Sequence, residues 1–159
     1  MLTINILCVG KIKEQFFKDA INEYSKRLSK YCKLHIIELP DEKIPNKTNE
    51  KINEEIRKKE CNNIINHIPK DSYPICLDLQ GKELSSENLA NKIDTLSFTT
   101  SSITFIIGGS LGVTKNLLQN CKESICFSKM TFPHQLIRVF LLEQIYRSFK
   151  IINGETYHK

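Results

Sequence analysis

Short apolar segments alternate with amphipathic ones along the chain, and this alternation limits the fold more than any other feature. An apolar run of roughly four to eight residues is typical of a buried strand, whereas apolar residues three or four apart are typical of a helix. Strands that alternate with helices predict an α/β fold, a mainly parallel sheet with helices on both faces. The expected strands are residues 2–9, 34–39, 74–79, 103–107 and 124–127.

The segments between these strands have apolar residues at helical spacing. Ser85 is a good N-cap for one helix, and Glu87 then lies in its first turn, where the helix dipole favours an acid. Thr114 is the expected cap of a short helix, and Pro133 suits the first turn of the last one. We expect helices over residues 14–29, 49–68, 85–96, 114–118 and 133–150.

The last expected helix is apolar on nearly every side, because its first half contains Leu136, Ile137, Val139, Phe140, Leu141 and Leu142. A helix that is apolar all round must be buried all round. The sheet of so small a chain covers one side only. We therefore expect a homodimer in which a second subunit covers the other side, with full burial inside one subunit as the alternative. Arg138 lies in this stretch, so we expect it to reach a carboxylate, an RNA phosphate or the subunit edge.

The composition is that of an ordinary globular protein, with 40% hydrophobic and 26% charged residues. No shift in composition marks a boundary, so we expect a single domain over residues 1–159. No apolar run approaches the roughly 20 residues that span a bilayer, and residues 1–10 have no basic leader. We therefore expect a cytoplasmic protein without a membrane partner. The net charge of +5 permits an RNA partner without demanding one.

The cysteines do not point to a metal centre. No two of them form a C-x-x-C pair, and their spacing matches no zinc pattern. We expect reduced and mostly buried thiols, and no metal. The six are Cys8, Cys32, Cys61, Cys76, Cys121 and Cys126.

Three of the expected strands end in segments that are suited to a ligand. These segments are residues 77–82, 107–112 and 127–134, and the carboxyl ends of parallel strands form the usual binding edge of an open α/β sheet. Gly108, Gly109 and Gly112 allow the backbone to approach a ligand closely. Their spacing fits neither the dinucleotide fingerprint nor a phosphate-binding loop.

The last residues of the chain carry a second group of candidate side chains. Tyr157, His158 and Lys159 combine a ring that can stack on a base, an imidazole that can move a proton and an ammonium that can hold a phosphate. A frayed tail is the alternative. Glu143 and Arg147 are spaced for an ion pair within one helix.

Several short motifs, in order along the chain, resemble the RlmH family of SPOUT-superfamily methyltransferases. They include Val9-Gly10-Lys11-Ile12-Lys13-Glu14, Leu77-Asp78 with Gly81-Lys82, and Ile107-Gly108-Gly109-Ser110. The strongest are Phe127-Ser128-Lys129-Met130-Thr131-Phe132-Pro133-His134 and the closing Tyr157-His158-Lys159. Each motif is weak alone, but together they are highly specific.

The resemblance implies a deep trefoil knot in the C-terminal part, a homodimer, and S-adenosyl-L-methionine as the methyl donor. It also implies that the tail of one subunit completes the site of the other. By correspondence with the family's motifs, the residues expected to bind the donor are Leu77, Gly108, Phe127, Ser128, Lys129, Met130, Thr131 and Phe132.

The implied reaction is methylation of N3 of pseudouridine 1915 in 23S rRNA of the assembled ribosome. The residues that match the family's active site are His134, Arg147, Tyr157 and His158. His158 is the first candidate for the general base and His134 the second, because imidazole titrates near neutral pH. Two alternatives remain, a methyltransferase of another RNA and a non-catalytic RNA-binding protein.

Overall fold

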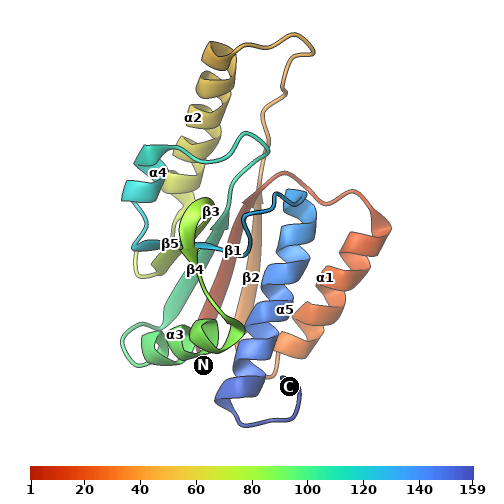
Figure 1. The fold of residues 1–159 in the computed structure, drawn as a ribbon, viewed down its shortest axis with the longest axis vertical. Helices are drawn as coiled ribbons and strands as arrows, with labels where there is room; N and C mark the ends of the chain where they lie inside the picture. The colour runs from red at the N-terminus through yellow and green to blue at the C-terminus, as the bar shows by residue number, and fades with distance from the viewer.

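The computed structural model describes all 159 residues and contains one sheet of five parallel strands (Figure 1). The strand order is β2-β1-β4-β3-β5, and every neighbouring pair is parallel. The expected α/β class is therefore confirmed. The strands are β1 (Thr3–Val9), β2 (Lys33–Leu39), β3 (Tyr73–Glu83), β4 (Ser102–Ile107) and β5 (Glu123–Cys126).

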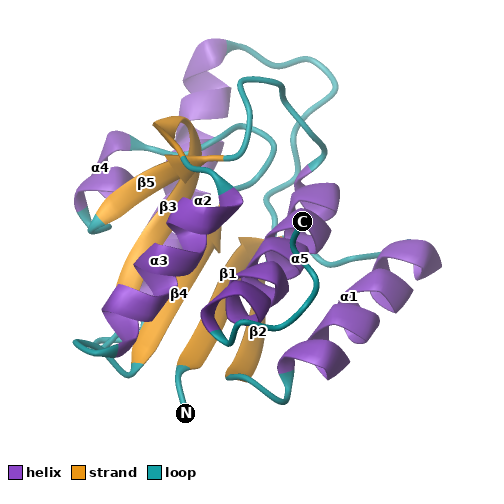
Figure 2. Cartoon of the chain, turned by 60° about the horizontal axis from the view of Figure 1, so that its bottom comes forward, coloured by secondary structure: helices purple, strands orange, loops and turns teal.

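Five helices cover the two faces of this sheet (Figure 2). Helices α1, α3 and α5 pack on one face, and α2 and α4 pack on the other. The side chains of β1 separate accordingly, since Ile4, Ile6 and Cys8 face the first group while Leu7 and Val9 face the second. The helices are α1 (Gln15–Leu28), α2 (Glu50–His67), α3 (Ser86–Ser97), α4 (Lys115–Gln119) and α5 (His134–Ile152).

The expected helix starts agree closely with the structure. The Ser85 side chain accepts a hydrogen bond from the Asn88 amide, and the Thr114 side chain accepts one from Leu117. Asn49 caps α2 in the same way, although the sequence did not single it out. Pro133 was expected in the first turn of α5, but it lies at the preceding cap position.

Strand β3 is longer than the expected strand over residues 74–79. It reaches Glu83, because its pairing with β5 breaks after Leu77 and resumes at Lys82. A Cβ atom at Gly81 would lie only 2.7 Å from the backbone of Ile125, so this second pairing needs glycine there. The irregularity lies inside β3 and coincides with residues 77–82, one of the three expected ligand-binding segments.

Helix α5 is buried along one side only. Leu141, Leu142 and Ile145 are inaccessible to solvent, but Phe140 is 38% exposed. The single chain therefore does not bury α5 on every side, which was the alternative to a dimer. No helix combines the length and the apolar character that crossing a membrane requires.

The buried charge of α5 is neutralised inside the chain. Arg138 is only 2% exposed, and its Nη1 donates to Glu38 at 2.8 Å. Its Nη2 donates to the carbonyl oxygens of Val9 and Gly10 at 2.8 and 2.6 Å. Of the three expected kinds of partner, the structure supplies the carboxylate. Arg138 thus holds the first turns of α5 against the ends of β1 and β2.

Candidate functional site

A cavity of about 550 Å³ opens where three strands end, next to the start of α5. Its walls come from β3 at the break after Leu77, from the loop after β4 and from the segment between β5 and α5. The structure thus brings together the three segments that the sequence indicated. The lining includes Leu77, Gly108, Phe127, Ser128, Met130, Thr131, Phe132 and His134. Lys129 was expected with them but is not among the lining residues.

Glycine is required in the loop after β4. A Cβ atom at Gly108 would lie 2.7 Å from Cγ1 of Val113, which folds back against the strand end. Gly112 has a φ of +83°, in the left-handed region that side chains disfavour. The amide of Gly112 closes the turn by donating to the Gly109 carbonyl at 3.0 Å. Because residue 108 has no side chain, its backbone is open to the cavity.

The segment between β5 and α5 has an irregular backbone. Its turn is held by the Ser128 hydroxyl, which accepts from the Met130 amide at 3.0 Å, and by Cys126, whose thiol lies 2.9 Å from the Ser128 carbonyl. Phe132 packs edge-on against Phe140 of α5, with ring centroids 5.5 Å apart. Residues 127–133 belong to no helix or strand, so most of their backbone groups make no regular secondary-structure hydrogen bonds.

The cavity wall includes two ionisable side chains of different kinds, His134 and Asp78. His134 is half-buried, and burial, together with the nearby Arg138 charge, lowers its pKa below the ordinary value for histidine. Its imidazole is therefore neutral at neutral pH and able to accept a proton. Asp78, just after the break in β3, is the one carboxylate in the lining. It lies in the expected ligand-binding segment 77–82 but was not among the residues named for the site.

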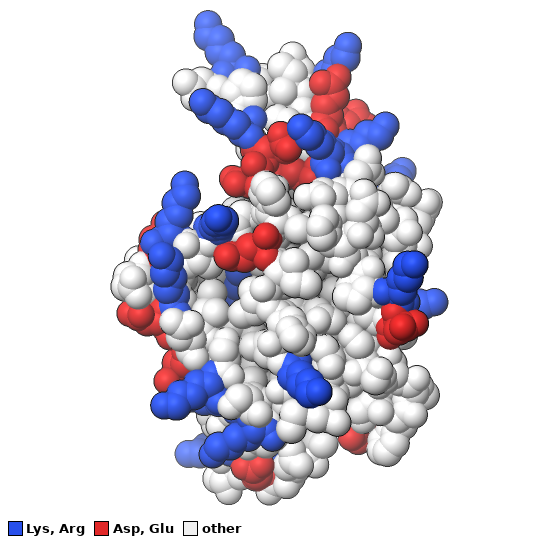
Figure 3. Space-filling model, turned by 180° about the vertical axis from the view of Figure 1, so that it is seen from behind, with Lys and Arg blue, Asp and Glu red and all other residues white.

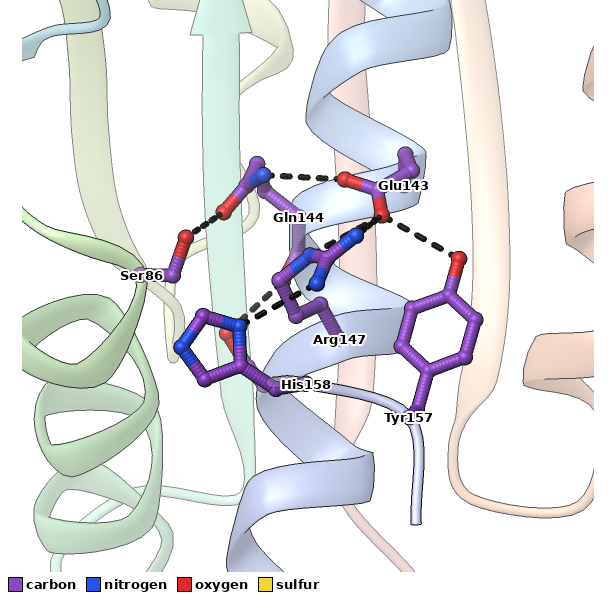
Figure 4. A network of polar contacts seen from close by, with 7 residues as sticks. Ser86, Glu143, Gln144, Arg147, Tyr157 and His158 are labelled. Atoms are coloured by element: carbon purple, nitrogen blue, oxygen red, sulfur yellow. Dashed lines mark hydrogen bonds and ion pairs between the residues drawn. The ribbon is translucent and has the colours of Figure 1, made fainter.

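Arg147, Tyr157 and His158 form a separate group, the tail cluster, on the last turns of α5 (Figure 4). Glu143 is its centre, accepting from Nε and Nη2 of Arg147 at 3.0 and 2.6 Å and from the Tyr157 hydroxyl at 3.2 Å. The Arg147 guanidinium also lies 4.7 Å from the centre of the Tyr157 ring. The last residues are therefore packed on α5, contrary to the alternative of a frayed tail.

Contacts inside the tail cluster set the charges of Arg147, Tyr157 and the neighbouring Glu87. The hydrogen bond to Glu143 raises the pKa of Arg147 above its ordinary value, so this side chain remains a cation. Burial raises the pKa of Tyr157, so its phenol stays protonated at neutral pH. Glu87 in α3 has its pKa lowered by its hydrogen bond to His158. The cluster therefore presents a fixed cation, a neutral phenol and an imidazole held between Arg147 and a carboxylate.

The tail cluster and the cavity lie at opposite ends of α5. His134 starts the helix and Arg147 follows 13 residues later (147 minus 134), which corresponds to about 20 Å along the axis. Of the four expected catalytic residues, the structure therefore brings three together and leaves His134 apart at the cavity. Within one chain, the tail does not line the cavity.

Charge on the surface is mixed. On the face shown in Figure 3, Lys and Arg side chains lie mostly toward the margins, with Asp and Glu among them. No single basic patch dominates this face, which agrees with a modest net charge of +5. No group of three or more His, Cys, Asp or Glu side chains is arranged to hold a metal ion.

Comparison with known proteins places this arrangement in a family. Residues 2–158 match the profile described as predicted SPOUT methyltransferase. The ribosomal RNA large subunit methyltransferase H of Clostridium beijerinckii is 56% identical over 159 residues, covering 99% of this chain and 100% of that protein. The protein of the same name from Clostridium botulinum strain Eklund 17B is 55% identical with the same coverage.

Two solved structures share the fold at low sequence identity. A "probable methylase family protein" from Haemophilus influenzae has a TM-score of 0.55 and 14% identity, covering 100% of this chain and 72% of that one. A tRNA (m1G37) methyltransferase from Aquifex aeolicus has a TM-score of 0.50 and 13% identity, covering 91% and 69%. The profile and the close relatives span nearly the whole sequence, so the chain belongs to the SPOUT methyltransferase family, together with the proteins named ribosomal RNA large subunit methyltransferase H.

Proposed function

We propose that this protein transfers a methyl group from S-adenosyl-L-methionine to N3 of pseudouridine 1915 in 23S rRNA of the assembled ribosome. The observation that carries the proposal is the end-to-end similarity, at 53–57% identity, to ribosomal RNA large subunit methyltransferases H. The strand-end cavity and the tail cluster lie on the residues that match that family's motifs.

The cavity suits the methyl donor. Its volume of about 550 Å³ lies within the range of small-molecule sites. Leu77, Phe127 and Phe132 supply apolar surface for an adenine ring, and the uncovered backbone at Gly108 suits a tightly bound polar group. Asp78 supplies a negative charge beside a ligand that carries a sulfonium and an ammonium. When bound, the donor supplies an electrophilic methyl group; Ser128, Met130 and Thr131 would complete its pocket, and Lys129 would remain at the rim.

The proposed active form is a cytoplasmic homodimer with a trefoil knot in the C-terminal part of each chain. Its support is the separation of about 20 Å between the cavity and the tail cluster along α5. A second copy, packed on the partly exposed side of α5 around Phe140, would bring its tail to this cavity. Each active site would then combine the cavity of one subunit with Arg147, Tyr157 and His158 of the other.

The proposed chemistry requires removal of a proton, because N3 of pseudouridine is protonated and is a poor nucleophile until that proton leaves. His158 is the first candidate for the base, and neutral His134 is the second. Arg147 would stabilise negative charge on a base carbonyl, and Tyr157 would stack on or orient the base. Lys129 and Lys159 would contact phosphates.

Two measurements test the proposal. Mass spectrometry of 23S rRNA from cells lacking this protein should show loss of the methylated pseudouridine, and an unchanged signal would contradict the assignment. Loss of a methyl group from a different RNA would instead indicate a different RNA substrate. Calorimetric titration should show binding of S-adenosyl-L-methionine, and its absence would favour a non-catalytic RNA-binding protein.

Mixed dimers test the shared site. A cavity variant, Gly108→Val, and a tail variant, His158→Ala, should each be inactive alone. Mixed, they should regain activity, because a dimer of the two contains one intact cavity facing one intact tail. Mixtures that remain inactive would show that cavity and tail act within the same chain.

A further inference from the structure

The imidazole of His158 is held from both sides by charged side chains of different helices. On one side, Nη1 of Arg147 in α5 lies 3.1 Å from Nδ1. On the other side, Oε1 of Glu87 in α3 lies 2.7 Å from Nε2. Glu87 is 71 residues from His158 in sequence and is not among the residues that the sequence pointed to as catalytic.

The chemistry of the partners decides which nitrogen of His158 carries the proton. A guanidinium has only donors, so Nδ1 must accept the Arg147 hydrogen and must itself be unprotonated. A carboxylate has only acceptors, so Nε2 must carry the proton that it shares with Glu87. The hydrogen bond to His158 lowers the pKa of Glu87, which keeps this carboxyl ionised. The two contacts thus select one neutral tautomer, with its lone pair on Nδ1.

The remaining charges around His158 reinforce this arrangement. Glu143 binds Nε and Nη2 of Arg147 and leaves Nη1 for the imidazole. The Tyr157 hydroxyl also donates to Glu143 (Figure 4). From α3, Ser86 donates to Gln144 at 2.7 Å, and Gln144 donates to Glu143 at 2.9 Å. Arg147 and Glu87 are therefore the charged groups in direct contact with the imidazole, and Glu143 acts on it through Arg147.

We infer that Glu87 is a positioning residue for methyl transfer, which holds His158 as the tautomer with a proton on Nε2 so that Nδ1 is the basic atom. The inference rests on the proposed function. When Arg147 turns from Nδ1 to an oxygen of the target base, Nδ1 accepts the N3 proton. The resulting imidazolium keeps its Nε2 hydrogen bond to Glu87, whose negative charge stabilises it. This division of labour between a carboxylate and an imidazole is the one found in Ser-His-Asp hydrolases.

The test compares Glu87→Gln with Glu83→Gln, an exposed carboxylate four residues earlier that makes no ion pair with His158. Glutamine can still accept the Nε2 hydrogen bond but has no charge. We expect kcat/KM for ribosome methylation to fall about two- to fivefold, the effect that an exposed ion pair allows. Glu83→Gln should match the unchanged protein.

Nitrogen NMR of the His158 ring gives a readout that does not depend on activity, with the signal assigned from a His158→Gln variant. In the neutral ring, we expect a pyrrole-like Nε2 and a pyridine-like Nδ1, and a smaller share of this tautomer in Glu87→Gln than in Glu83→Gln. A proton on Nδ1, or equal tautomer shares and equal kcat/KM in the two variants, would overturn the inference. An unchanged protein that methylates no ribosome would defeat the proposed function instead, while the NMR result would still decide the Glu87 contact.

Discussion

Each end of α5 carries an arginine that is paired with a glutamate, but the two pairs differ in what surrounds them. Arg138 is 2% exposed and reaches Glu38, which is 100 residues away in sequence, and two backbone carbonyls of the β1 end. Arg147 is 25% exposed and pairs with Glu143, one turn earlier in the same helix. The first pair joins distant parts of the chain, whereas the second can rearrange without disturbing the sheet.

This difference matches the roles of the two ends. The cavity is walled by strand ends and by the first turns of α5, which Arg138 holds to β1 and β2. A cavity for a small ligand benefits from such rigidity, because little ordering is left for binding to bring about. The tail cluster is partly exposed, and in the proposed reaction its contacts open when the target base binds. The buried arginine–glutamate pair thus holds the fold together, while the partly exposed pair serves the proposed reaction.

The largest effect on activity should come from the tail end. We expect His158→Ala to lower kcat at saturating ribosome about 100-fold or more, the typical contribution of a general base. Single-turnover methyl transfer measures this loss, and His67→Ala, at the exposed end of α2, is the control. Turnover equal to that of the unchanged protein would remove His158 as the base and leave His134 as the candidate.

The largest effect on stability should come from the cavity end. Arg138→Met removes the buried guanidinium and leaves the Val9 and Gly10 carbonyls without their donor. We expect the free energy of unfolding to fall by about 3 kcal/mol, the lower end of the range for a broken buried pair, since Glu38 is partly exposed. Urea unfolding measures the change.

The matched control is Arg27→Met, which breaks the solvent-exposed ion pair between Arg27 and Glu23 within α1. Its effect should stay below about 1 kcal/mol. If both variants lost the same free energy of unfolding, burial would not distinguish the Arg138 pair from an exposed ion pair.

A third prediction concerns the shape of the cavity wall. Gly108→Ala places a methyl group 2.7 Å from Val113 Cγ1, so one of the two must move. We expect a loss of about 1–3 kcal/mol in stability and weaker binding of S-adenosyl-L-methionine. Thermal unfolding and calorimetry measure the two effects. Adding Val113→Ala should restore part of both, and a double variant as impaired as the single one would locate the strain elsewhere.

The smallest effect should be a pH dependence at His134. Its pKa in the folded chain is lower than the ordinary 6.5, with burial as the main cause, so the unfolded chain binds this proton more readily. This contribution to stability is present above the unfolded pKa and is lost as the pH falls through the folded pKa.

Urea unfolding at pH 7 and pH 5 measures this contribution. The loss of unfolding free energy on acidification should be slightly smaller in His134→Gln than in the unchanged protein. A larger loss in the variant would mean that the folded state favours protonated His134, against the cavity geometry.

Much of the secondary structure was predictable because its causes are local. The Ser85 and Thr114 side chains cap helices through amides three residues away, and the apolar runs of β1 and β4 mark buried strands in any context. The three strand-end segments followed from the same local patterns, since parallel strands place their carboxyl ends on one edge. The break in β3 after Leu77 was missed, because it depends on how closely β5 approaches Gly81.

The residue types and their order were enough to identify a parallel α/β fold, the strand ends that meet at its edge and the family of the chain, because periodicity, capping and motif spacing act over a few neighbouring residues. The strand order, the carboxylate that meets Arg138 and the approach of Glu87 to His158 depended on long-range folding. The two contacts join residues that are 100 and 71 positions apart in sequence. The strand order follows from the path of the crossover connections. A charged side chain has many possible partners along a sequence. The packing of the helices on the sheet decides which of them it meets.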